Sequence, residues 1–219
     1  MKLISWRLAM QATMLALVVS TAVRAADPAE RGAAASSKQS LQAKLEYCKT
    51  CHGLSAQGYR GYFAMPRLAG QQPQYIENQL HAFIEHRRRN AIMTNAARAL
   101  NPSMVAALAQ HFKDLDPKPL GGAPKDQVAA GKKIYEEGIP EANVPACPAC
   151  HGAEAKGLNE IPRLAGQLYP YTIKVLTNWS NERGQDPANP DTSSIMAVTA
   201  HNLTQAQIAE IAAYVSSLN

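Results

Sequence analysis

The clearest hydrophobic pattern in this chain is a helical stripe that occurs twice. Its apolar positions have the i, i+3, i+4, i+7 spacing of an amphipathic helix. They are Val105, Leu108, Ala109, Phe112 and Leu115, matched one for one by Ile208, Ile211, Ala212, Val215 and Leu218. Each stripe follows a helix start, with Asn101 as N-cap before Pro102 in one and Thr204 with Gln207 as a capping box in the other. No stretch alternates like a strand, so the pattern predicts an all-α fold.

The stripes belong to a longer internal repeat. The hexapeptide PRLAGQ occurs at residues 66–71 and again at 162–167. At the same offset, four further residues recur: Tyr75, Leu80, Phe83 and Arg87 correspond to Tyr171, Leu176, Trp179 and Arg183. Residues 118–124 between the halves are rich in proline and glycine, which is typical of a linker. We therefore predict two tandem domains related by internal duplication, residues 26–117 and 125–219, joined by linker 118–124.

The first 25 residues have the organisation of a signal peptide. Lys2 and Arg7 precede an apolar run at 8–19, and small residues follow at 23–26. A retained membrane anchor is the weaker alternative, because the run is shorter than the roughly 20 residues that span a bilayer. Cleavage removes three basic residues and lowers the formal charge from +5 to +2. This small charge gives no reason to expect nucleic-acid binding.

All four cysteines lie in two C-x-x-C-H pentapeptides, residues 48–52 and 147–151. In this motif two thiols attach covalently to a haem and the adjacent imidazole ligates its iron. We therefore predict that Cys48, Cys51, Cys147 and Cys150 attach two haem c groups, with His52 and His151 as axial ligands. A zinc site would bring the pairs within about 15–20 residues, and a thioredoxin-like pair or two disulfides would leave both histidines unexplained. With the export signal, covalent haem indicates the periplasm.

The second axial position distinguishes electron carriers from enzymes. Met93 stands seven residues before Leu100, and Met196 stands seven residues before Leu203. We predict that these paired methionines, in irregular segments ahead of the final helices, are the distal iron ligands. Met65 and Met104 have no methionine counterpart in the other half, and we place Met104 off the apolar stripe.

Taken together, the motifs CKTCHG, MPRLAGQQPQYIENQLHAF, VPACPACHG and IPRLAGQ resemble those of the dihaem cytochrome c4 family over nearly the whole mature chain. The resemblance implies two class I cytochrome c domains with low-spin His/Met haems. It also implies that the carbonyls of Pro66 and Pro162 orient the proximal histidines, and that Arg67 and Arg163 lie near propionates. The chain departs from the family pattern around Met93, which lacks a proline-containing run, and in about seven extra residues at 184–190.

The expected function is electron transfer in the periplasm, without catalysis of a small-molecule reaction. The resemblance implies a membrane cytochrome complex as electron donor and a terminal respiratory oxidase as acceptor. We expect a monomer that can associate peripherally with the membrane. The alternatives are a dihaem enzyme, of peroxidase or thiosulfate-oxidising type, and a cytochrome subunit of a periplasmic dehydrogenase.

Overall fold

The computed structural model describes residues 28–183 and 192–219. The predicted signal peptide and the extra segment at 184–190 lie outside these residues. Residues 37–219, which contain both C-x-x-C-H motifs, form one compact unit. No helix within the described residues is long and apolar enough to cross a membrane.

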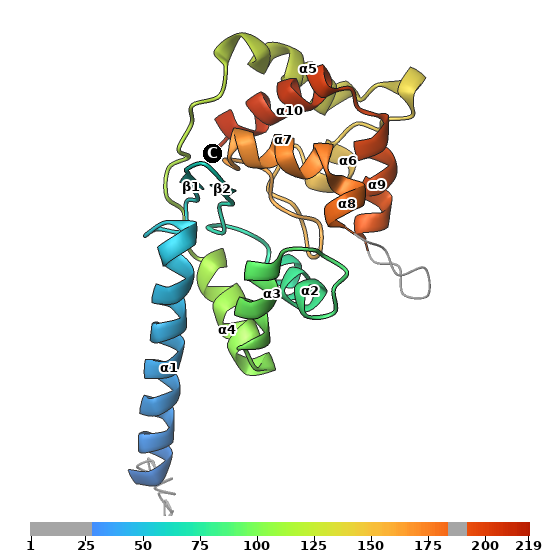
Figure 1. The fold of residues 1–219 in the computed structure, drawn as a ribbon. Coiled ribbons are helices and arrows are strands. Elements are labelled where there is room, and N and C mark those ends of the chain that lie inside the picture. Colours follow the sequence, from blue (N-terminus) through green and yellow to red (C-terminus); the bar gives the residue numbers. More distant parts are fainter. Residues whose placement is uncertain (1–27, 184–191) are drawn as a thin grey trace, which may run out of the picture. The chain divides into compact units, whose positions relative to one another are not determined.

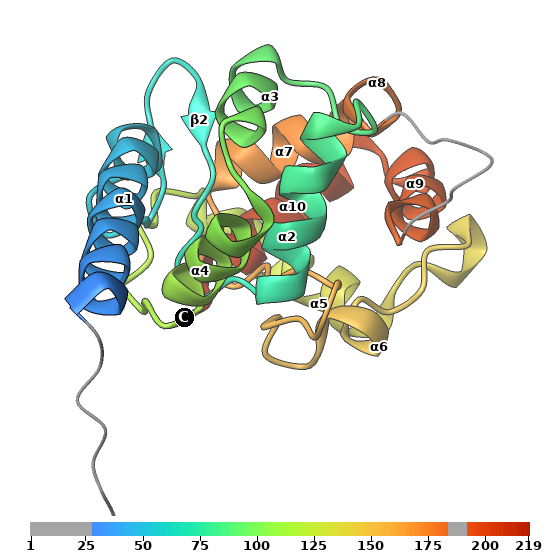
Figure 2. The ribbon, with the colours of Figure 1, turned by 90° about the horizontal axis from the view of Figure 1, so that it is seen from below.

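The first half is built on four helices and a short hairpin (Figure 1). Its elements are α1 (Pro28–His52), β1 (Tyr59–Arg60), β2 (Ala64–Met65), α2 (Pro73–Ile84), α3 (Ala91–Arg98) and α4 (Pro102–Lys113). Helix α2 packs on α3 and α4, as the view in Figure 2 also shows. Apolar side chains of α1, α2 and α4 meet in one buried cluster, whose largest members are Leu45, Ile76, Leu108 and Phe112.

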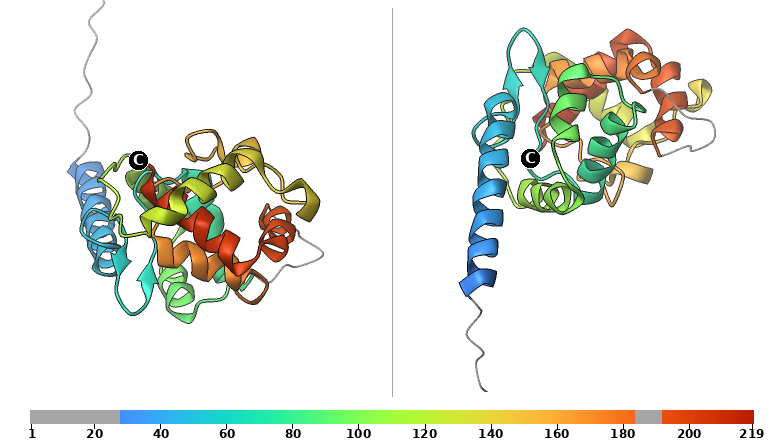
Figure 3. Two further views of the ribbon diagram at one scale, coloured as in Figure 1. Left: turned by 90° about the horizontal axis from the view of Figure 1, so that it is seen from above. Right: turned by 60° about the horizontal axis from the view of Figure 1, so that its bottom comes forward.

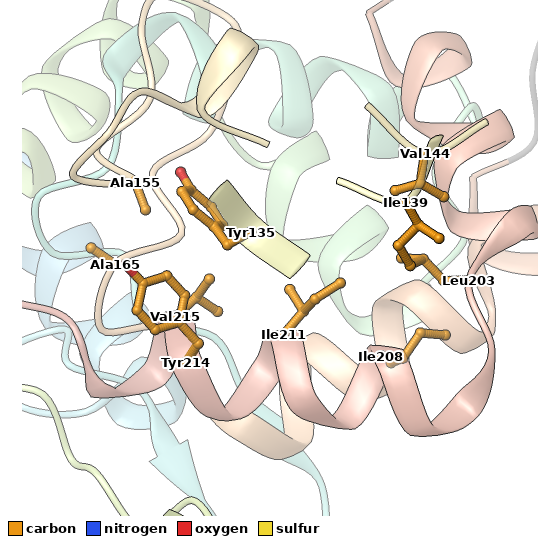
Figure 4. Packing of buried hydrophobic residues seen from close by; sticks show 10 residues of the cluster. All are labelled: Tyr135, Ile139, Val144, Ala155, Ala165, Leu203, Ile208, Ile211, Tyr214 and Val215. Atoms are coloured by element: carbon orange, nitrogen blue, oxygen red, sulfur yellow. The ribbon is translucent and has the colours of Figure 1, made fainter. Parts of the chain in front are cut away.

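The second half repeats this plan with more and shorter helices. Its elements are η1 (Lys125–Gln127), α5 (Val128–Glu137), η2 (Pro140–Ala142), α6 (Pro148–His151), α7 (Tyr169–Thr177), α8 (Trp179–Glu182), α9 (Ser193–Asn202) and α10 (Gln205–Ser217). Helix α10, red in Figure 3, packs on α5 and α7. The core of this half centres on Tyr135 of α5 and on Ile208, Ile211 and Val215 of α10 (Figure 4).

The predicted starts of the two final helices are confirmed. The side chain of Asn101 accepts a hydrogen bond from the backbone N–H of Met104 at 2.8 Å. Thr204 and Gln207 form the complete capping box, with bonds of 3.3 and 2.9 Å. Each cap satisfies N–H groups that the first turn of a helix leaves unpaired. The all-α fold class is confirmed as well.

The hairpin of β1 and β2 was not predicted. It pairs Tyr59 with Met65 and Arg60 with Ala64 in antiparallel register. The chain needs 14 residues from His52 to Pro66, but only 11 from His151 to Pro162. With three additional residues, this connection forms the hairpin in the first half. In the second half the shorter connection forms the single bridge between Leu158 and Ile161.

Candidate functional site: two haem-binding sites

Each C-x-x-C-H motif ends a helix with its histidine turned inward. His52 is the last residue of α1 and His151 the last of α6, and both are buried. His52 Nδ1 lies 2.9 Å from the carbonyl oxygen of Pro66, and His151 Nδ1 lies 2.9 Å from that of Pro162. A carbonyl oxygen only accepts, so Nδ1 carries the proton and Nε2 keeps its lone pair for a metal.

The loop after each motif holds the proline carbonyl in place. Ala56 and Ala155 are fully buried with φ of 54°, and each carbonyl accepts two backbone N–H groups of the PRLAGQ hexapeptide at 2.7–3.0 Å. Gly157 has φ of +66°, and a Cβ at this position would lie 2.3 Å from the carbonyl oxygen of Ile161. Only glycine fits so close to the backbone that leads to Pro162. The same backbone arrangement therefore orients the histidine in both halves.

The state of the cysteines agrees with haem attachment. All four thiols are free, and Cys51 and Cys150 are exposed while Cys48 and Cys147 face the cores. Burial raises the pKa of Cys48 and raises that of Cys147 to about 11. A thioredoxin-type pair requires a lowered pKa, which argues against that alternative. Within 28–183 and 192–219, no group of three or more His, Cys, Asp or Glu side chains is arranged to hold a metal ion.

The two histidines are poised as neutral ligands. The pKa of His52 is lowered chiefly by burial, which the bond to Pro66 opposes and the charge of Arg88 reinforces. The pKa of His151 is lowered by burial against the bond to Pro162. A neutral imidazole with a fixed tautomer is the form that ligates iron.

The two arginines of the hexapeptides differ in how fully they are paired. Arg67 donates to the carbonyls of Ala69 and Pro117 at 3.0 and 2.8 Å and contacts Asp116 at 3.5 Å. Arg163 donates from Nε to the Ala165 carbonyl at 3.0 Å, but its buried Nη2 has no hydrogen-bond partner among the described residues. A buried cationic donor without an acceptor is costly. Arg163 therefore fits a carboxylate such as a haem propionate, whereas Arg67 is already occupied.

The prediction that the paired methionines lie in irregular segments was wrong, whereas their role as iron ligands stays a prediction. Met93 lies in α3 and Met196 in α9, both half-buried. The Asn90 side chain accepts the N–H of Met93 at 3.0 Å and thereby starts a helix where we expected a loop. Met104, which we placed off the apolar stripe, packs against the first core. Met65 lies in β2.

Sequence reasoning missed a reciprocal contact between the halves. Gln71 accepts the N–H of Arg163 at 2.7 Å and donates to its carbonyl at 3.0 Å. Gln167 accepts the N–H of Arg67 at 2.8 Å and donates to its carbonyl at 3.1 Å. Both glutamines are buried. The last residue of each hexapeptide thus pairs with the backbone of the other hexapeptide, and we call these four bonds the glutamine clamp.

A cation–π contact within each half corrects the register of the repeat. We paired Arg87 with Arg183, but Arg87 binds the neighbouring Glu85 at 2.7 Å. Arg88 is the counterpart: its Cζ lies 4.7 Å from the Phe83 ring centroid, as that of Arg183 lies 4.8 Å from Trp179. One extra residue precedes Arg88, in a turn where His86 has φ of 61°.

Comparison with known proteins agrees with this geometry. The family model for cytochrome c matches residues 30–117 and 128–219. Cytochrome c4 of Thiocapsa roseopersicina is 36% identical over 175 residues, covering 78% of this chain and 87% of that protein. The thiosulfate dehydrogenase electron acceptor of Thiomonas intermedia is 34% identical, covering 78% and 77% of the two chains.

Among solved structures, cytochrome c4 of Acidithiobacillus ferrooxidans superposes with a TM-score of 0.68 at 35% identity and covers 78% of this chain and 98% of its own. The two cytochrome c domains, each with a complete C-x-x-C-H motif, fit two covalently bound haem c groups. On this evidence the chain belongs to the dihaem cytochrome c4 family.

Proposed function

We propose that this protein is a periplasmic electron carrier that delivers single electrons to a terminal respiratory oxidase. The observation that carries the proposal is that the proximal histidine is held in the same way in both sites. Each histidine is buried at a helix end and bonded through Nδ1 to a proline carbonyl at 2.9 Å. A dihaem enzyme needs one site with an open or different ligand. The matched proximal sides, with a methionine at the same place in each repeat, favour two sites of one kind.

The iron ligands in this proposal are His52 with Met93 and His151 with Met196. Cys48, Cys51, Cys147 and Cys150 form the thioether bonds. When bound, each haem supplies a one-electron Fe(III)/Fe(II) couple, and sulfur ligation raises its potential relative to two imidazoles. The residues of this chain orient the imidazoles and surround each site with an apolar core that excludes water. In this proposal the unpaired Nη2 of Arg163 binds a propionate.

A second candidate is the same carrier with a different donor, a thiosulfate dehydrogenase. The relative from Thiomonas intermedia is named as the electron acceptor of such an enzyme. This candidate retains the haem ligation and the one-electron chemistry. It changes only the protein from which electrons arrive.

The test uses the purified holoprotein. A pyridine haemochrome assay should give two haems per chain, and stopped-flow mixing with oxidase-containing membranes should oxidise both. Added salt should slow this oxidation, because transient redox encounters are accelerated by complementary charge. Reduction by a thiosulfate dehydrogenase supplied with thiosulfate would favour the second candidate. Rapid turnover of peroxide or thiosulfate by the protein alone, without oxidation by membranes, would refute both.

A further inference from the structure

Two buried arginines, one from each half, converge on a single oxygen atom. Gln79 Oε1 accepts a hydrogen bond from Arg88 Nη1 at 2.9 Å and another from Nη1 of Arg183. Arg88 and Arg183 are only 9% and 5% exposed. Arg88 also donates to the Tyr171 hydroxyl at 2.7 Å, and Arg183 to that of Tyr75 at 3.3 Å. We call these five residues the arginine cluster.

The cluster is symmetric except at its centre. Tyr75 and Tyr171 correspond in the repeat, and each receives the arginine of the other half. At the same offset Gln79 corresponds to Val175, which has no hydrogen-bonding side chain. A single amide therefore accepts from both guanidinium groups, and among the described residues the matching position of the repeat, Val175, offers no second side-chain acceptor.

The cluster holds two positive charges without a direct ion pair, although the charge of Glu182 helps to raise the pKa of Arg88. Neither arginine is ion-paired with a carboxylate of the described residues, and Arg183 Nε is buried without an acceptor. Burial alone would raise the pKa of Tyr75, but Arg183 and Arg88 outweigh it and hold this pKa below its ordinary value.

Each guanidinium group also stacks on an aromatic ring beside a proposed distal methionine. Arg88 lies over Phe83, whose carbonyl accepts the hydroxyl of Thr94, next to Met93, at 3.2 Å. Arg183 lies over Trp179, whose indole N–H donates to the carbonyl of Ser193 in α9, the helix of Met196, at 3.2 Å.

A positive potential at a haem favours its ferrous state, which carries one positive charge fewer than the ferric state. The position of each guanidinium group therefore bears on the electron affinity of its own half. Because both groups share one acceptor, displacement of that acceptor disturbs both halves at once.

We propose that Gln79 is a positioning residue for electron transfer: by holding Arg88 and Arg183 on one oxygen, it sets the electron affinities of the two haems jointly. This rests on the proposed function only in requiring two redox-active haems. The partner proteins that donate and accept electrons do not enter the inference.

Two substitutions of opposite character test it by spectroelectrochemical titration of the holoprotein. Gln79→Glu places a negative charge between the guanidinium groups. The reduction potentials of both one-electron steps should then fall. We expect about a tenfold loss of electron affinity in each, which is 59 mV for a one-electron couple. Gln79→Leu removes the acceptor oxygen and its partial negative charge. Both potentials should then rise, by about threefold in electron affinity. A merely structural role would not give opposite signs.

Gln110→Leu is the matched control, because Gln110 is exposed, bonds Asp114 and lies outside the arginine cluster. It should leave both steps within about 10 mV of the parent, well under the 59 mV of a tenfold change. The inference is overturned if only one step moves, if both Gln79 variants shift the same way, or if Gln110→Leu reproduces the shifts. If the parent shows two haems and two steps but neither Gln79 variant changes them, this inference fails and the carrier function stands.

Discussion

Breaking the glutamine clamp on one side should weaken the contact between the two halves and lower the stability of the molecule. Gln71→Leu removes two hydrogen bonds to Arg163 and leaves a buried backbone N–H and a buried carbonyl without partners. Each stranded buried group costs about 1–3 kcal/mol. Since the leucine recovers part of this by apolar burial, we expect a loss of about 2–4 kcal/mol in the free energy of unfolding.

Urea titration of the holoprotein, followed by far-UV circular dichroism and by Soret absorption, measures this loss. The parent should unfold in one transition because the halves share buried contacts. Gln71→Leu, or the double variant with Gln167→Leu, should separate the curves of the two halves, as expected when domains cease to unfold together. Gln110→Leu is the control, since Gln110 is exposed and bonds only Asp114. Its change should stay within about 0.5 kcal/mol.

The reasoning would be refuted if Gln71→Leu lost no more than this control. It would also fail if the double variant kept a single sharp transition at the parental midpoint. Either result would mean that the arginine cluster holds the halves together without the clamp.

Three further outcomes follow from the structure. Met93→Ala and Met196→Ala should each abolish half of the weak red absorption band that marks sulfur on ferric iron. Met104→Ala should leave this band intact and destabilise the first core. The reverse pattern would contradict the ligand assignment. Thr204→Ala should lower the free energy of unfolding by about 1 kcal/mol through loss of the capping box, measurable by thermal denaturation. Asn101→Ala should cost a similar amount, and no change would show that Pro102 alone starts helix α4.

Local patterns predicted the helices that have clear caps and stripes. The starts at Asn101 and Thr204 follow from residues three positions apart, so one window of sequence contains the whole argument. The same rule applied to Asn90 would have placed Met93 in a helix. We gave more weight to the expected need for a flexible ligand loop, and that expectation was wrong.

Contacts between the halves could not be predicted from local sequence patterns. The repeated glutamine at the end of PRLAGQ was visible, but nothing local indicates that its partner lies 92 or 100 residues away. The choice between Arg87 and Arg88 depended on a one-residue insertion in a run of three arginines. Fixed-offset comparison selects the wrong member of such a run, whereas the stacking on Phe83 identifies Arg88.

The swapped bonding of the two hexapeptides has a consequence for how this molecule keeps its two halves together. Residue i of one copy meets residue j of the other, and j meets i, which is the isologous pattern of a homodimer with twofold symmetry. Here the two copies are covalently joined, so their encounter is intramolecular and does not weaken on dilution. A pair of separate subunits held by the same four bonds would dissociate at low concentration, and an electron could then no longer pass between them.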